Sequence, residues 1–104
     1  MKEDRCLIVS PVAIHRNAVV HGFYGGELNV PEKLALIHSE VSEALEAHRN
    51  SIPEGAKGCM SEELADVVIR VFDLSEALGL GIVEAVARKC EINKSRPWKH
   101  GKLY

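Results

Sequence analysis

Two pairs of acidic side chains carry the residue types and spacing in this sequence that could do chemistry. Glu40 and Glu43 lie in the segment HSEVSEALEAHRN, and Glu63 and Asp66 lie in EELAD. Residues three apart are neighbours on a helix, where like charges repel and cost a few tenths of a kcal/mol. Because acidic pairs are also common on solvated helix surfaces, spacing alone leaves two readings open: ordinary surface charge, or ligands gathered around a cation.

The position of each pair around its helix adds information. The first of these helices has an apolar stripe, and Glu40 and Glu43 lie on a partly apolar strip, not on the fully polar side where Glu46 lies. The stripe contains Leu34, Ile37, Val41, Ala44, Leu45 and His48. On the second helix Glu63 lies at the border of the apolar arc, and Asp66 lies on the polar side.

Taken together, the two pairs predict a cation site. Two antiparallel helices can bring four carboxylates to one volume, and close negative charges are unfavourable unless a cation neutralises them. The four residues are Glu40, Glu43, Glu63 and Asp66. Carboxylates without cysteine or histidine suit a hard ion such as Mg²⁺ or Mn²⁺. A di-iron bundle would need Glu-x-x-His motifs, and none of the five histidines has a glutamate three residues before it.

Capping signals divide the chain into the helices that must position these residues. Ser10, Asn29 and Ser61 are the expected N-caps, prolines follow the first two, and Gly79 ends the third helix. The predicted helices cover residues 11–22, 30–50, 61–79 and 82–95, followed by a basic tail at 96–104. The pattern predicts one all-α domain over residues 1–104, a four-helix bundle with short connections.

The last predicted helix carries a polar row that continues its apolar face. Lys89, Asn93 and Arg96 lie on the same side as Val86 and Cys90. One reading is structural: long basic side chains snorkel at a helix end, and an amide caps a neighbouring loop. The other is a row of donors aimed at anionic oxygens, with lysine as a point charge and arginine as a fork.

Composition narrows the class of protein. The chain has 104 residues, a net charge of -2 and 46% hydrophobic residues, as in an ordinary globular domain. This charge gives no global attraction to nucleic acid or to an anionic membrane, and no apolar run approaches the roughly 20 residues that span a bilayer. The three cysteines form no C-x-x-C motif, so a reducing cytoplasm is expected. A core this small makes oligomerisation a natural source of further burial.

The acidic pairs and the later polar row together resemble the motifs of the MazG-like nucleotide pyrophosphohydrolases, which belong to the all-α NTP pyrophosphatases. The residues that carry the resemblance are Glu40, Glu43, Glu63, Asp66, Lys89, Asn93 and Arg96. It covers about residues 30–101 and includes the segments EKLALIHSE, EELADV and N-x-x-R-P-W. It implies a MazG-like fold that assembles as a homodimer or homotetramer, with the site near a subunit interface.

The resemblance also implies an activity and a role for each residue. The activity is Mg²⁺-dependent hydrolysis of a nucleoside or deoxynucleoside triphosphate to the monophosphate and pyrophosphate, with water attacking the α-phosphorus. The implied metal ligands are Glu40, Glu43, Glu63 and Asp66, with Glu62 as an extra acidic partner. The implied substrate-binding residues are Lys89, Asn93 and Arg96. Glu40 or Glu43 is expected to orient the attacking water or to accept its proton.

Two alternatives stay open at this point. The chain could be a non-catalytic helical module that binds nucleotides or a protein partner, or a dCTP- or dUTP-type pyrophosphatase on the same scaffold. The base preference is not encoded in a recognisable motif. The aromatic residues that could stack on a base are Phe23, Tyr24, Phe72, Trp98 and Tyr104.

Overall fold

The computed structural model of the protein describes residues 9–97, which form four helices and no strand. The helices are α1 (Pro11–Val20), α2 (Val30–Arg49), α3 (Met60–Leu78) and α4 (Ile82–Lys94). The predicted all-α class and the number of helices are confirmed, and each predicted helix end lies within two residues of the observed one. The basic tail beyond Pro97 lies outside the described residues. None of the helices in the described range is both long and apolar enough to cross a membrane.

Side-chain caps explain where the first two helices begin. Ser10 Oγ accepts a hydrogen bond of 3.1 Å from the Ala13 amide, and Asn29 Oδ1 accepts one of 3.0 Å from the Glu32 amide. Both caps satisfy amides that lack a partner inside the helix, and a proline occupies the first turn of each helix. These two predicted N-caps are therefore confirmed.

The start of α3 differs from the prediction. Its N-cap is Cys59, not Ser61, and the Cys59 side chain accepts no hydrogen bond from an amide of the first turn. Instead Glu62 Oε1 accepts a hydrogen bond of 2.9 Å from the Gly58 amide, and Glu54 Oε1 accepts one of 3.4 Å from the Ser61 amide. Two glutamate side chains near the start of the helix therefore accept the backbone hydrogen bonds that were expected to go to the Ser61 hydroxyl.

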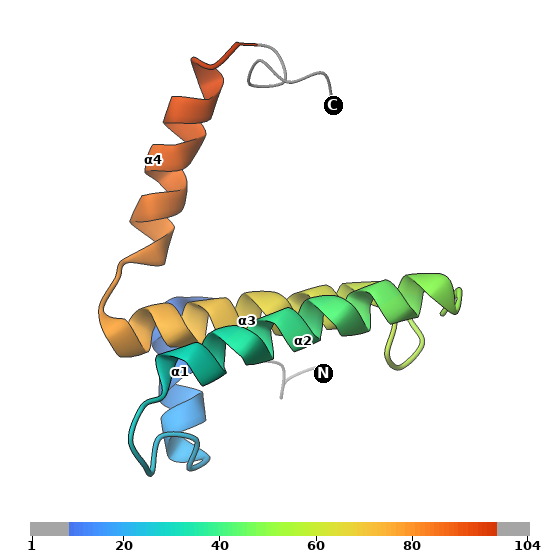
Figure 1. Ribbon diagram of the computed structural model, residues 1–104, viewed down its shortest axis with the longest axis horizontal. Coiled ribbons are helices and arrows are strands. Elements are labelled where there is room, and N and C mark those ends of the chain that lie inside the picture. The colour runs from blue at the N-terminus through green and yellow to red at the C-terminus, as the bar shows by residue number, and fades with distance from the viewer. Residues whose placement is uncertain (1–8, 98–104) are drawn as a thin grey trace, which may run out of the picture.

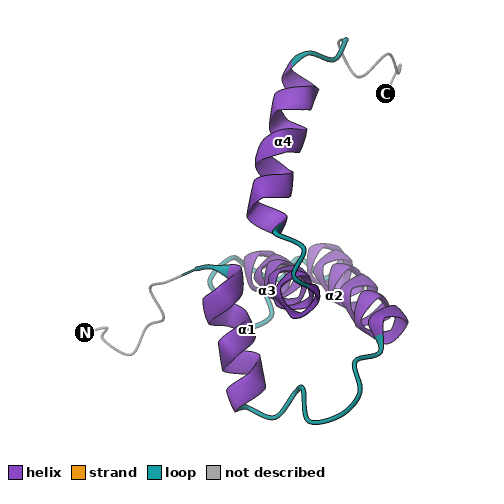
Figure 2. Cartoon of the chain, turned by 90° about the vertical axis from the view of Figure 1, so that its left-hand side faces the viewer, coloured by secondary structure: helices purple, strands orange, loops and turns teal. Residues whose placement is uncertain are grey.

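Three of the helices pack together around α3. α2 and α3 lie side by side and antiparallel, and α1 packs against the C-terminal half of α3, at the end of the pair where α2 begins (Figure 1). Seen along the α2–α3 pair, α1 lies to one side of α3 and α2 to the other (Figure 2). α3 is thus the central element, and its side chains face both neighbours.

α4 leaves this unit, so a single chain does not form the predicted bundle of four packed helices. α4 projects away from the other three helices and contacts the C-terminal end of α3 (Figures 1 and 2). The turn before it uses two glycines in the left-handed region, Gly79 at φ +67° and Gly81 at φ +65°. The buried Ser75 hydroxyl accepts a hydrogen bond of 3.2 Å from the Ile82 amide, which fixes the first turn of α4 onto α3.

The apolar core of one chain is small. Among the described residues, the buried hydrophobic side chains are Ala44, Ala47, Cys59 and Leu74. Ala44 belongs to the predicted stripe on α2, but Leu34, Val41 and Leu45 of that stripe are 49%, 51% and 48% exposed. The stripe is only partly covered, because α4 does not return over it.

Candidate metal centre

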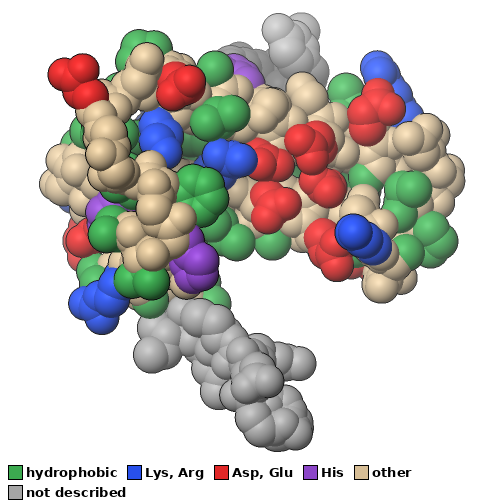
Figure 3. All heavy atoms as spheres, turned by 90° about the horizontal axis from the view of Figure 1, so that it is seen from below, with side chains coloured by type: hydrophobic (Ala, Val, Ile, Leu, Met, Phe, Trp, Pro, Cys, Tyr) green, Lys and Arg blue, Asp and Glu red, His purple; other side chains and the backbone are tan. Residues whose placement is uncertain are grey.

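One face of the molecule gathers charged side chains of both signs. Seen from the side opposite to the direction of α4, several Asp and Glu side chains cluster in the middle of the surface, with Lys and Arg side chains next to them (Figure 3). The acidic group of greatest interest is a triad from two helices. α2 supplies Glu40 and Glu43, and α3 supplies Glu63.

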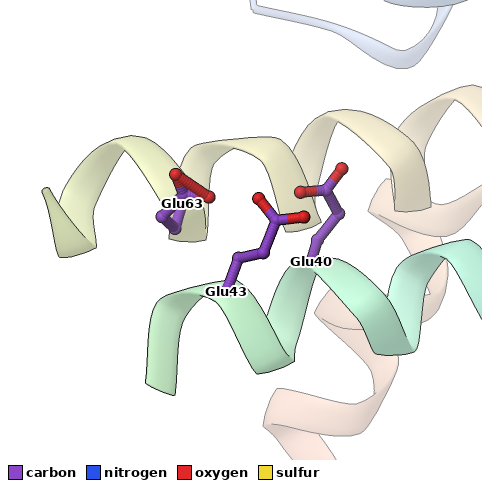
Figure 4. Close-up of side chains that lie close together, drawn as sticks. All are labelled: Glu40, Glu43 and Glu63. Carbon is purple, nitrogen blue, oxygen red and sulfur yellow. The ribbon is translucent and has the colours of Figure 1, made fainter. Parts of the chain in front are cut away.

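The three carboxylates of the triad point toward one another across the gap between α2 and α3 (Figure 4). One oxygen from each of Glu40, Glu43 and Glu63 can be chosen so that all three lie within 4.8 Å of one another. Glu40 is buried, Glu63 is half-buried and Glu43 is exposed. The predicted convergence is thus observed for three of the four acids, and the triad is a group that could hold a metal ion.

Glu63 is the residue of the triad at which burial and repulsion from the neighbouring carboxylates act together. Its Oε2 atom is buried, and it has no hydrogen-bond partner among the described residues. Burial raises the pKa of Glu63, and the adjacent Glu43 carboxyl and the charges of Asp66 and Glu40 raise it further. A buried oxygen without a donor, facing other carboxylates, needs a proton or a cation. The residues therefore fit a hard cation.

Asp66 stands beside the triad and not in it. It is exposed, and no oxygen of Asp66 completes the set of ligand atoms within 4.8 Å. The neighbouring charges still change the pKa of Asp66. Partial desolvation of its carboxyl raises the pKa, the Glu40 charge raises it further, and the Arg70 charge lowers it. Glu62 is also outside the triad, since its carboxylate accepts the Gly58 amide.

A cation that the sequence did not predict is in direct contact with the triad. Arg70 Nε donates a hydrogen bond of 2.6 Å to Glu40 Oε2, and the Glu40 side chain in this ion pair is only 10% exposed. The signal was present in the spacing of Glu63, Asp66, Arg70 and Asp73, which puts them along one side of α3. The wheel puts Asp66 on the polar side of the helix, but in the fold Arg70 on this side contacts Glu40 of α2 and Asp73 contacts His15 of α1.

A cleft lies between Glu40 of the triad and α1. Its volume is about 860 Å³, within the range of small-molecule sites. Glu40 and Asp66 lie at its acidic part, and its wall includes several apolar side chains of α1 and α3. The basic and aromatic residues that line it are Arg16, Lys33, Arg70 and Phe23. Of the predicted stacking residues, Phe23 therefore borders the cleft, and Trp98 and Tyr104 lie outside the described residues.

A second polar network, also missed from the sequence, borders the cleft at Asp73. Tyr24 Oη donates a hydrogen bond of 2.7 Å to Asp73 Oδ2, and His15 Nδ1 lies 2.8 Å from Asp73 Oδ1. The His15 and Tyr24 rings meet edge to face with centroids 4.7 Å apart, and Lys33 Nζ lies 4.5 Å from the Tyr24 ring centroid. This network ties α1, the following loop and α2 to α3.

Within one chain the predicted substrate-binding residues do not meet the triad. Lys89, Asn93 and Arg96 are exposed residues of α4 and of the turn that follows it, and none of them lines the cleft. Glu63 lies in the first turn of α3, whereas α4 leaves from the other end of that helix. The triad and the polar row of α4 are therefore far apart in one chain, because α4 points away from the α2–α3 pair.

Comparisons with protein-family models, with curated proteins and with solved structures found no significant match to this chain. The fold and the site define a small all-α protein of four helices with an acidic triad between α2 and α3. The comparisons assign it to no family, so the case for a function depends on the motifs and on the geometry.

Proposed function

We propose that the protein hydrolyses nucleoside or deoxynucleoside triphosphates to the monophosphate and pyrophosphate, with Mg²⁺ or Mn²⁺ as cofactor. The observation that carries the proposal is that Glu40 of the triad lines a cleft that also has basic side chains on its wall. A carboxylate cluster favours a cation, and basic residues nearby favour an anion. A metal-bound polyphosphate satisfies both.

The cation would be held by Glu40, Glu43 and Glu63, with Asp66 beside them. The unpartnered Oε2 of Glu63 supports this assignment, because a cation would provide the charge that this buried atom lacks. When bound, the ion would offset negative charge on the phosphate oxygens during the displacement at phosphorus. At Glu63 and Asp66 the ion would take the place of the protons that the raised pKa values of these two carboxyls favour.

Glu40 and Glu43 would divide their roles. Glu40 is buried and one of its oxygens is already held by Arg70, so it is suited to fixed ligation. Glu43 is exposed, and its carboxylate forms no ion pair with a basic residue in the described part of the chain, so it can orient a water molecule and take its proton. Arg16 and Lys33 would attract the phosphates, and Phe23 offers a face for the base.

A second copy of the chain would complete the site. We propose a homodimer or homotetramer in which α4 of one copy brings Lys89, Asn93 and Arg96 to the cleft of another. Two observations support this: α4 carries half-exposed apolar residues such as Val86 and Ile92, and the α2 stripe is half exposed in one chain. Exposed apolar surface on a small protein favours association. Sedimentation at micromolar concentration would give a monomer if this part is wrong.

The test is incubation of the purified protein with a panel of NTPs and dNTPs, with Mg²⁺, with Mn²⁺ and with EDTA. The expected products are nucleoside monophosphate and pyrophosphate, and EDTA should abolish them. A strong preference for dCTP or dUTP would define the narrower enzyme on the same scaffold. Orthophosphate as product, or no turnover across the panel, would reject the proposal. The absence of turnover would favour a non-catalytic helical module that uses its exposed apolar faces to bind a partner.

A further inference from the structure

We propose that Arg70 binds a phosphate group in the cleft while its Nε atom stays on Glu40, so that the cation and a polyphosphate bind cooperatively. The class of ligand, a pyrophosphate or a nucleoside polyphosphate, rests on the proposed function. The hydrogen bond of Arg70 to Glu40 and its place in the cleft are both seen within one copy of the chain, so the role of Arg70 needs no second subunit. The inference makes Arg70 a substrate-binding residue in addition to those expected on α4.

The geometry of the guanidinium leaves it free for a second partner. Only Nε is used, in the 2.6 Å hydrogen bond to Glu40 Oε2, and the group makes no other hydrogen bond in the described part of the chain. The Arg70 side chain is 39% exposed and lines the cleft. An arginine fork has five N–H donors in one plane, and its outer nitrogens match the oxygens of a phosphate.

The charges around Arg70 favour an anion there. A polyphosphate that enters the cleft meets Glu40 and Asp66, which would repel it. Arg70 contacts the first of these acids, and its charge opposes the rise in the pKa of the second. Of the three basic residues that line the cleft, Arg70 is therefore the one in contact with the triad, and its position is called the boundary between the acidic cluster and the rest of the cleft. A phosphate at this boundary would touch both Arg70 and the metal ion.

A purely structural role is the competing account. Arg70 joins α3 to α2 through an ion pair whose glutamate is buried. In the competing account this ion pair holds the two helices together and has no other role. The exposed pair of Arg49 with Glu46 at 3.4 Å is an example with no cleft beside it. The two accounts differ in binding: a structural arginine has no effect on anion affinity once the fold is intact.

The experiment is calorimetric titration of inorganic pyrophosphate into the protein in the presence of Mn²⁺. The variants are Arg70→Gln, Arg70→Lys and the matched surface control Arg49→Gln, each checked for helicity by circular dichroism. Arg70→Gln should weaken binding about ten-fold or more, because a charge-assisted hydrogen bond is lost. Arg49→Gln should stay within about two-fold of the wild-type affinity, as expected for a screened surface charge.

Arg70→Lys keeps the result decisive if Arg70→Gln does not fold. Lysine keeps the charge but cannot hold Glu40 and a phosphate with separate nitrogens, so we expect an intermediate loss. Pyrophosphate affinity equal to wild type in a folded Arg70 variant would overturn the inference. Because the titration needs no turnover, a panel without hydrolysis would reject the proposed function alone. Normal hydrolysis with an unchanged KM in Arg70→Gln would reject this inference alone.

Discussion

Tyr24 Oη donates a hydrogen bond of 2.7 Å to Asp73 Oδ2, and this contact joins the loop after α1 to the C-terminal half of α3. His15 occupies the other oxygen of the same carboxylate at 2.8 Å. Both Asp73 oxygens are therefore satisfied by residues from the N-terminal part of the chain. The pair holds this side of the cleft in place, since Asp73 itself lines it.

Tyr24→Phe tests the strength of this contact. The variant leaves Asp73 Oδ2 without its donor, and we expect the free energy of unfolding to fall by about 1 kcal/mol at pH 7. Burial, the hydrogen bond to Asp73 and the Asp73 charge all raise the pKa of Tyr24. A raised folded-state pKa means that the contribution is complete below the unfolded value of about 10 and declines as pH rises above it. Urea unfolding at pH 7 and at alkaline pH should therefore show the two proteins converging; a constant difference would contradict this.

Glu43→Gln tests the triad in turnover. The side chain is exposed, so the helices should fold normally while hydrolysis falls at least about 100-fold, the scale of a lost catalytic group. Glu46→Gln is the matched control, because Glu46 is an exposed glutamate one turn later on α2, paired with Arg49. Initial rates with the preferred nucleotide decide the outcome. Equal rates in the two variants would remove Glu43 from the site.

Glu40→Gln and Asp66→Asn extend the same test to the other acids. Both should lose turnover, but Glu40→Gln should also lower stability, because it weakens the buried ion pair with Arg70. Asp66 is exposed, so Asp66→Asn should keep the melting temperature of the wild type. Rates and thermal melts measured together separate the two effects. Near-normal activity in Asp66→Asn would show that the fourth acid is dispensable.

Glu63→Gln tests the cost of bringing the carboxylates together. Burial and the neighbouring Glu43 raise the pKa of Glu63 in the fold, so its protonated form favours the folded state. That contribution is present below the unfolded pKa and is lost as pH rises through the raised folded value. In EDTA the wild type should therefore lose stability as pH rises from acid toward neutral, and Mg²⁺ should restore it at neutral pH. Glu63→Gln should show a smaller loss and a smaller effect of Mg²⁺ on the melting temperature; identical curves would argue against the cation site.

Mixing two impaired variants tests whether α4 serves another copy. Lys89→Ala should raise KM, and Glu43→Gln should lower turnover at least about 100-fold, so each variant alone should be slow at substrate concentrations well below the raised KM. If each site combines acids of one copy with α4 of the other, mixed dimers contain one intact site. After exchange of subunits about a quarter of the wild-type sites would return, from random pairing in a two-fold dimer. No recovery in the mixture would place Lys89 with the acids of its own chain or outside the site.

The helices were predictable because their signals are local. Ser10 and Asn29 cap α1 and α2 through contacts three residues along the chain, and Gly79 adopts the left-handed conformation that ends α3. That Glu40 and Glu43 lie together was predictable for a similar reason, because their i,i+3 spacing puts them on one side of α2. In both cases the information lies within about one turn of helix.

The rest depends on tertiary contacts. The direction of α4 follows from the hydrogen bond between the Ile82 amide and the Ser75 hydroxyl across two glycines, and no periodicity encodes it. The roles of Arg70 and Asp73 depend on which neighbours face α3. Their partners, Glu40 and Tyr24, lie 30 and 49 residues away along the chain. A helical wheel sees the polar side of α3 but not the helices that cover it.

The central place of α3 sets which parts of this chain can change length. One residue inserted after Glu63 would turn the remainder of the helix by about 100° and move Arg70 and Asp73 away from Glu40 and Tyr24. In the connection at residues 50–59, Glu54, Gly58 and Cys59 are held by the start of α3, so a change of length is expected there only before Glu54. Natural or engineered variants should therefore gain and lose residues in that part of the connection, while the interval from Glu63 to Asp73 stays constant.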